Sequence, residues 1–274
     1  MPVYCVLFFS FAFGVSIQIW IIYAASTFQW SLRSRYINCT RRRPTLNISM
    51  MNTDDNSSVP EEVFHTTLTV VDFHHDTSGS TRDVYVLGTH TTLSAAKAFA
   101  LSALSHLGYQ PDDFLEYTTR VHTPSEAWKH GDGVMVYAKA PAGHEFLVGL
   151  DTKPNTESLP AGPDNTLLLP DGHDHLHYVI QNRTDYNQDK SGAYQITEIQ
   201  GCYARRDDAW TAAKATLQAD QEKFVQYDDR DDAESDSEWP FGEEVIVHAV
   251  AYTGEMYTVA VKTVSGAHKW HKKR

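Results

Sequence analysis

The sequence predicts an α+β fold made of two tandem ββαβββ modules, each a mainly antiparallel sheet with one helix on a face. One observation behind this prediction is an internal repeat: Trp128 recurs 111 residues later as Trp239, and one Gly and two Val follow each Trp at the same spacing. The other observation is that segments of strand and helix character follow one another in the same order in both halves. Self-similarity at a fixed offset indicates a duplicated structural unit.

The repeat extends well beyond the two tryptophans. At the same offset Gly143 matches Gly254, and upstream Gly88 matches Gly201 at an offset of 113. Small changes of offset are expected from insertions in loops. Each copy is about 95 residues long, which is enough to bury a core of its own.

The first copy opens with a predicted hairpin. Residues 63–73 are rich in β-branched and aromatic side chains, which is typical of a strand. The polar residues 74–80 contain Gly79 and predict a turn, and 84–88 return as a second strand.

A helix follows this hairpin. Thr92 is a suitable N-cap, and Gly108 is a suitable stop after the last turn. Between them the apolar residues fall on one stripe at helical period: Leu93, Ala96, Ala100, Ala103, Leu104 and Leu107. A short strand at 114–117 and a hairpin of 133–140 with 145–150 complete the first copy.

The second copy repeats this plan. Its elements are a hairpin of 178–180 with 194–197, a helix at 207–219, and strands at 224–227, 244–251 and 256–262. Asp207 and Asp208 suit the positive end of the helix dipole. The order of strands within each sheet does not follow from the sequence.

The predicted organisation has six parts. They are an apolar segment (1–32), a basic and polar linker (33–60), module 1 (61–153), a proline-rich linker (154–172), module 2 (173–264) and a basic tail (265–274).

The apolar segment has three interpretations. Residues 3–25 carry no charge and are long enough to cross a membrane as a helix, and the arginines that follow favour repeats in the cytoplasm. A cleaved signal peptide is a rival interpretation, although a basic start is lacking. In the third, the first 49–50 residues are not part of the protein, which then starts at Met50 or Met51 as a soluble cytoplasmic protein.

Charge limits the partners. The chain carries a formal net charge of −12, and since residues 1–50 hold five arginines and no acid, the remainder carries −17. Because so acidic a surface repels phosphate backbones, we do not expect nucleic acid to be a partner. An unknown protein or small molecule, basic or bearing a cation, is the expected one, together with a membrane if residues 3–25 form an anchor.

Histidines and acids suggest two metal hypotheses, neither of which the sequence favours. His173, His175 and His177 could share one face of an extended segment, with His74, His75 or Asp76 as a distant ligand, but the first copy has no such cluster. The acidic run 228–238 lacks the glycine and spacing of a calcium loop. We therefore predict no metal site and no cofactor, and assign no cofactor-binding residue.

Catalytic motifs are also lacking. The sequence contains no Gly-x-Ser-x-Gly, phosphate-binding loop, Gly-x-Gly-x-x-Gly or His-Glu-x-x-His. Cys202 and His248 could form a nucleophilic pair, but Thr89 and Tyr137 replace them in the first copy. We therefore predict no catalytic residues.

The two tryptophans, Trp128 and Trp239, could stack on a ligand, but their occurrence in both copies favours a role in the fold. The sequence thus favours a non-catalytic module that binds a ligand or a protein. An enzyme with its site between the modules, metal-dependent or acid/base, and a membrane-tethered cytoplasmic adaptor are the alternatives.

Overall fold

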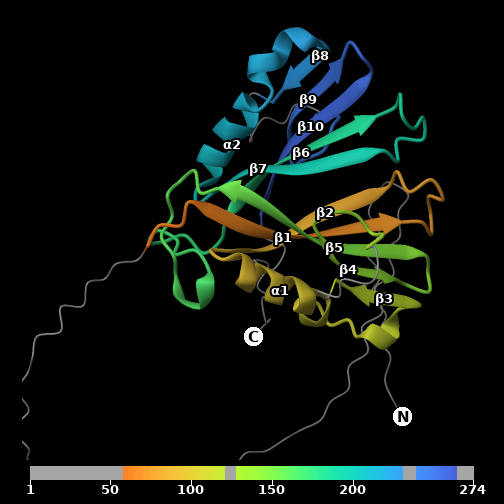
Figure 1. Ribbon diagram of the computed structural model, residues 1–274. Coiled ribbons are helices and arrows are strands. Elements are labelled where there is room, and N and C mark those ends of the chain that lie inside the picture. The colour runs from red at the N-terminus through yellow and green to blue at the C-terminus, as the bar shows by residue number, and fades with distance from the viewer. Residues whose placement is uncertain (1–57, 121–127, 231–238, 264–274) are drawn as a thin grey trace, which may run out of the picture. The chain divides into compact units, whose positions relative to one another are not determined.

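The computed structural model describes residues 58–120, 128–230 and 239–263 (Figure 1). The first copy contains β1 (Glu62–Asp72), β2 (Arg82–His90), α1 (Leu93–His106), β3 (Glu116–Thr119), β4 (Val134–Lys139) and β5 (His144–Pro154). The second contains β6 (His177–Asp185), β7 (Gln195–Tyr203), α2 (Arg206–Ala215), β8 (Phe224–Asp229), β9 (Val245–Ala251) and β10 (Glu255–Thr263). Short 3-10 helices lie at Pro111–Asp113, Pro163–Asn165 and Gln218–Lys223.

The two copies form two five-stranded antiparallel sheets with the same topology. The strand orders are β2-β1-β5-β4-β3 and β7-β6-β10-β9-β8, so the last strand of each copy lies at the centre, beside the first. Each sheet has one helix packed against it, which confirms the predicted α+β class with tandem ββαβββ modules.

Each helix covers one face of its own sheet, and the remaining faces pack on each other (Figure 1). Under α1 lies a core that includes Leu104, Val136 and Val148, and under α2 a core that includes Val179, Val247 and Val259. A third core joins the sheets and consists of Val63, Val86, Leu159, Leu176, Tyr178, Ile180, Ile199 and Cys202. The two modules therefore share a buried apolar interface.

The predicted limits of the first helix are confirmed. The Thr92 hydroxyl accepts a hydrogen bond from the backbone N–H of Ala95 at 3.3 Å, and the helix begins at Leu93. At its end Gly108 takes a φ of 94°, which favours glycine. The apolar stripe is buried only in its middle, because Leu93 and Leu107 at its two ends are exposed.

The second helix is shorter than predicted. It ends at Ala215, and a separate 3-10 helix follows at Gln218–Lys223 instead of a continuous helix to residue 219. Thr216 explains the change, because its N–H bonds to Ala213 three residues back and its hydroxyl bonds to the Ala212 carbonyl. The N–H bond to Ala213 has 3-10 geometry, and the α-helix ends there.

Most strands also differ from their predicted limits; the largest differences are in β6 and β7, which run to Asp185 and Tyr203 instead of ending at 180 and 197. β3 covers Glu116–Thr119 rather than 114–117, because the 3-10 turn Pro111–Asp113 precedes it and places Phe114 against the first core. The predicted acidic insertion begins later than expected, since Asp228 and Asp229 belong to β8. The rest of that run, 231–238, and the basic tail lie outside the described residues.

The segment between the modules packs on the shared interface. β5 continues to Pro154, and beyond it Leu159 is buried in the core between the sheets, with Leu167 and Leu169 packed against that core. Both modules belong to one compact unit, which lies within 54–274. The proposed anchor at 3–25 lies outside the described residues, and no helix within the described ranges is long and apolar enough to cross a membrane.

Candidate functional site

Matching residues of the two modules occupy equivalent places in their sheets. The β1–β2 pairing shifts register between Thr66 and Thr67, and the β6–β7 pairing shifts between Val179 and Ile180. Thr66 and Val179 are 113 residues apart, and so are Thr67 and Ile180. The same offset relates Gly88 to Gly201. The offset therefore identifies structurally equivalent residues across the interface.

Equivalent residues make reciprocal hydrogen bonds across the interface. Arg82 Nη2 donates to the carbonyls of Gly79 (2.8 Å) and Ala193 (2.6 Å). Its equivalent, Gln195, donates through Nε2 to the carbonyls of Gly192 (2.9 Å) and Ser80 (2.8 Å). The accepting residues are equivalent as well, because Gly79 and Gly192 are 113 residues apart, and so are Ser80 and Ala193. The modules thus associate like the subunits of an isologous dimer, about an approximate twofold axis.

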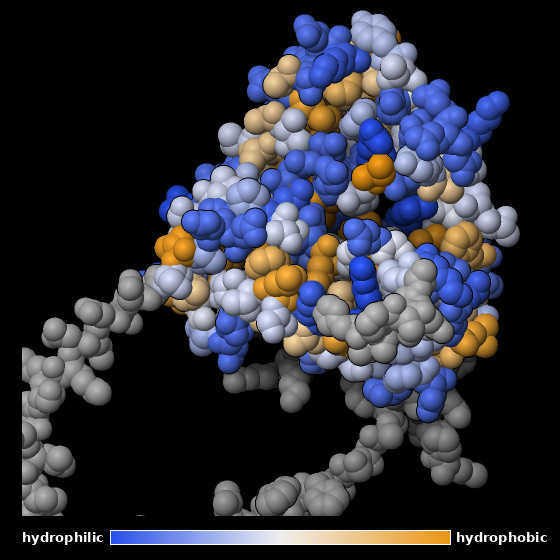
Figure 2. Space-filling model, viewed as in Figure 1, coloured by the Kyte–Doolittle hydropathy of each residue, from blue (hydrophilic) through white to orange (hydrophobic). Residues whose placement is uncertain are grey.

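A pocket lies on one side of this axis. It has a volume of about 280 Å³, and the space-filling view shows the surface hollowed between the two sheets (Figure 2). β2 of the first module and β6, β7 and β10 of the second supply most of its lining. The lining residues are Arg82, Val84, Ile180, Asn182, Gln195, Thr197, Gly242, Glu243, Glu244, Val245, Thr258, Ala260 and Lys262.

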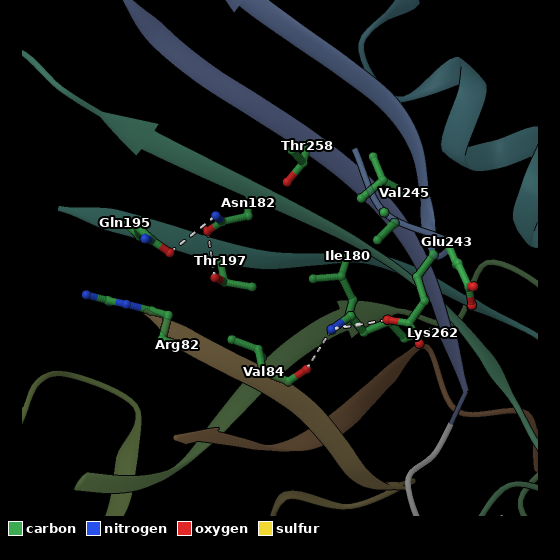
Figure 3. A pocket seen from close by; sticks show the side chains of 13 residues that line it. Arg82, Val84, Ile180, Asn182, Gln195, Thr197, Glu243, Val245, Thr258 and Lys262 are labelled. Carbon is green, nitrogen blue, oxygen red and sulfur yellow. Dashed lines mark hydrogen bonds and ion pairs between the residues drawn. The ribbon is translucent and has the colours of Figure 1, made fainter. Parts of the chain in front are cut away.

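Charged groups mark the two ends of the pocket, with amides and hydroxyls between them. Figure 3 shows Arg82 and Gln195 at one end and Glu243 at the other. Lys262 is already engaged, because its Nζ lies 3.4 Å from the Glu244 carboxylate and donates to the Val84 carbonyl at 3.3 Å. Arg82 and Glu243 are therefore the charged lining residues that form no ion pair within the described part of the chain.

Arg82 is a cation without an acidic partner among the described residues. Its guanidinium bonds only carbonyl oxygens there, and its buried Nε has no hydrogen-bond partner. Burial lowers the pKa of Arg82 from its ordinary value, although arginine remains charged at any physiological pH. Such a cation has unused capacity to hold an anion.

The tryptophans take part in equivalent aromatic ladders. Trp128 meets His130 edge-on at 4.9 Å, and His130 stacks on Tyr137 at 3.9 Å. In the second module Trp239 meets Phe241 at 5.0 Å, and Phe241 stacks on His248 at 3.9 Å. These ladders stay within each module and do not line the pocket, so they fit a role in the fold.

The structure separates the imagined nucleophilic pair. Cys202 lies on β7 and His248 on β9, and two strands, β6 and β10, lie between them. Three strand spacings amount to about 14 Å. Cys202 is also buried, and desolvation raises the pKa of its thiol to about 12. A thiol that stays protonated at neutral pH is a poor nucleophile.

His173, His175 and His177, at the start of the second module, do not come together with the nominated distant ligands. His175 contacts His177 edge-on at 4.9 Å, but within the described residues no compact group of metal-ligating atoms includes them. Asp76 is occupied by the hydroxyls of Ser78 and Ser80, each at 2.6 Å. A different cluster does form, in which His75 lies with Asp72 and His144.

Sequence reasoning missed Arg82 and Glu243 of the pocket, and Asp72 and His144 of the histidine cluster. Arg82 stands out only when the two copies are aligned, because Gln195 occupies its place in the second module. His144 is recognised only through the pairing of β1 with β5, which places it opposite Asp72. The repeat itself contained the first signal, whereas the second required the strand order.

Comparison with protein-family models, curated proteins and solved structures finds no match to this chain. The fold and the pocket nevertheless define a class: a duplicated α+β protein whose two modules associate about an approximate twofold axis. Its function has to be argued from the geometry of the sites.

Proposed function

We propose that this protein is a non-catalytic binding protein that holds a small zwitterionic molecule in the pocket at the junction of its modules. The observation that carries the proposal is the charge of Arg82, which lines one end of the pocket and has no acidic partner among the described residues.

The charge of Arg82 is not needed for the contact between the modules. Its equivalent, Gln195, uses a neutral amide to make hydrogen bonds to the two equivalent carbonyls. Keeping a partly buried cation costs free energy of desolvation unless an anion compensates it. A ligand carboxylate would provide that compensation through charge-assisted hydrogen bonds.

The opposite end of the pocket suits a positive group. Glu243 presents an exposed carboxylate there, and the neighbouring Glu244 is paired with Lys262. Between the ends lie the amides and hydroxyls of Asn182, Thr197 and Thr258. A volume of about 280 Å³ is at the lower limit of ligand pockets, which favours a ligand of metabolite size.

A series of ω-amino carboxylates, from glycine to 6-aminohexanoate, tests the proposal. We expect one length to raise the melting temperature of the full-length chain more than the alkyl carboxylate or alkylamine of equal length. Arg82→Gln copies the second module, so it should fold normally and lose this stabilisation. Lys190→Gln removes an exposed charge from the β6–β7 turn and serves as the control.

The proposal fails if no amino carboxylate exceeds its singly charged analogues in the wild-type chain. It also fails if Arg82→Gln responds to the ligands as the wild-type chain does. The rival enzyme with a metal site between the modules is less well supported, because the one metal-capable cluster among the described residues does not line this pocket.

The remaining expectations about partners and location extend this proposal. We propose that residues 3–25 tether the binding modules to a membrane on its cytoplasmic side, and that nucleic acid is not a ligand. Carbonate extraction of the full-length chain tests the tether. Recovery in the soluble fraction, with an amino terminus mapped at Met50 or Met51, would refute it.

A further inference from the structure

Two turns of the first module bring three metal-binding side chains together. Asp72 is the last residue of β1, and its direct partner on β5 is His144. His75 follows Asp72 within the β1–β2 turn. One ligand atom from each residue lies within 4.8 Å of the others.

Short distances already join these groups. His75 Nδ1 lies 2.8 Å from Asp72 Oδ2, and His144 Nε2 lies 3.4 Å from Asp72 Oδ1. In a tetrahedral zinc site with bonds of about 2.0–2.1 Å, neighbouring ligand atoms are about 3.3 Å apart. The observed separations of 2.8 and 3.4 Å are close to that value.

The backbone around this group is held by the aspartate and not by the imidazoles. Asp72 Oδ1 accepts hydrogen bonds from the N–H groups of His74 and His75, both at 3.0 Å. Gly143 has a φ of 101°, and a Cβ there would lie 3.4 Å from His74 N, so the β4–β5 turn approaches the first turn closely. The ligand atoms therefore sit on two ordered hairpins.

The second module shows what the same turn looks like without histidine. Asp185, the equivalent of Asp72, accepts from the N–H groups of Asn187 (3.0 Å) and Gln188 (3.3 Å). Gln188 Nε2 donates to Asp185 Oδ2 at 3.2 Å, as the His75 ring does to Asp72. Glu255 is the β10 residue opposite Asp185. The turn thus forms equally well with a glutamine and a glutamate, and the imidazoles serve something other than the fold.

We propose that Asp72, His75 and His144 bind one divalent transition-metal ion of the zinc class. Two imidazoles and one carboxylate suit Zn²⁺ and its neighbours in the first transition row, whereas Mg²⁺ and Ca²⁺ prefer oxygen ligands throughout. Three protein ligands leave one position for water, and His75 is 71% exposed, so the ion is reached from solvent. The net charge of −17 on residues 51–274 attracts cations to this surface.

Zn²⁺ titration of the untagged full-length chain, followed by calorimetry, tests the site. We expect one tight equivalent, and Co²⁺ in its place should give visible absorption bands typical of nitrogen coordination. The double variant His75→Gln, His144→Glu copies the second module, so it should fold normally. It should bind Zn²⁺ about 100-fold more weakly, because both imidazole ligands are lost and only two carboxylates and an amide remain.

The duplication also allows a gain of function. Gln188→His with Glu255→His places two imidazoles beside Asp185, and this variant should bind a second equivalent of Zn²⁺. The proposal is overturned if the wild-type chain binds no Zn²⁺ at micromolar concentration, or if the double variant of the first module binds it unchanged. In the latter case other histidines hold the metal. Arg82→Gln should leave Zn²⁺ binding intact, so this test is independent of the ligand in the pocket.

Discussion

His65 and Tyr178 are equivalent residues of the two modules, and their rings meet edge-on at the module interface. The ring centroids are 5.6 Å apart with an interplanar angle of 89°. Both side chains are fully buried, and both hydrogen-bond to one hydroxyl, that of Thr89: His65 Nδ1 at 2.8 Å and Tyr178 OH at 2.7 Å. Cys202 stands where a second threonine would complete the symmetry. The centre of the interface therefore depends on a single shared hydroxyl.

Thr89→Val should destabilise the fold more than Tyr178→Phe. Valine leaves the His65 ring and the Tyr178 hydroxyl buried without a partner, which costs about 3 kcal/mol in total. Phenylalanine removes one hydroxyl while Thr89 keeps its bond to His65, so the cost is about 1 kcal/mol. Urea unfolding monitored by tryptophan fluorescence measures both.

Thr152→Val, at an exposed position of β5, controls for the chemical change alone. The shared-hydroxyl interpretation is wrong if Thr89→Val and Thr152→Val unfold at the same urea concentration. It is also wrong if Tyr178→Phe is the more destabilising of the two interface variants.

The fold should lose stability as the pH falls from about 6.5 to about 4. Desolvation first, and then the nearby Lys153 cation, lower the pKa of His65 to about 4, and His65 Nε2 has no partner within the described residues. The unfolded chain, with a pKa near 6.5, binds the proton first, so protonation favours unfolding throughout this window. The loss is roughly 3 kcal/mol by pH 4, with no further loss from His65 below it.

Urea unfolding at a series of pH values measures this dependence, and His65→Asn separates the contribution of this ring. Asparagine can keep a bond to Thr89 but cannot titrate, so the variant should show a shallower slope over the same window. Burial also lowers the pKa values of His90, His177 and His248, which leaves a residual slope of the same sign. An unchanged slope in His65→Asn would rule out the assignment.

Features determined by local sequence could be predicted, and features determined by distant pairing could not. The start of the first helix was predicted to the residue and its end to within one residue, since Thr92 and Gly108 act on the turns next to them. The second helix ended early, where the Thr216 N–H bonds to the carbonyl three residues back, and helical periodicity alone does not reveal that change of bonding. The repeat predicted equal topologies, yet not the central place of β5 and β10 in their sheets.

The same distinction explains the candidate sites. His75 is near Asp72 in sequence, whereas His144 joins them only because β5 pairs with β1. The pocket needed knowledge of how the modules associate, which no pattern within one module reveals. The sequence shows that a charged Arg82 stands where the second module has the neutral Gln195. Only the structure shows that both side chains make equivalent hydrogen bonds to carbonyl oxygens, so that the charge is not needed for them.

Cys202 should resist modification in the folded protein. Its thiol is buried between the sheets, and desolvation, with a smaller effect from Glu157, raises its pKa to about 12. In a Cys5→Ser, Cys39→Ser background, Ellman's reagent at pH 8 should react with no thiol until urea is added, and then with one. Rapid reaction in the native state would mean that the interface opens readily, which would contradict a stable association of the modules.

The two tryptophans should contribute similar stabilities through ring contact alone. In each module the indole nitrogen is buried and has no hydrogen-bond partner among the described residues, so replacing the indole by a phenyl ring breaks no hydrogen bond there. Trp128→Phe and Trp239→Phe should therefore each cost about 1 kcal/mol or less, while the alanine variants lose an aromatic pair and its buried area, about 2–4 kcal/mol. Urea unfolding measures all four variants. If either alanine variant keeps wild-type stability but loses ligand-induced stabilisation, that tryptophan is a binding platform and its assignment to the fold is wrong.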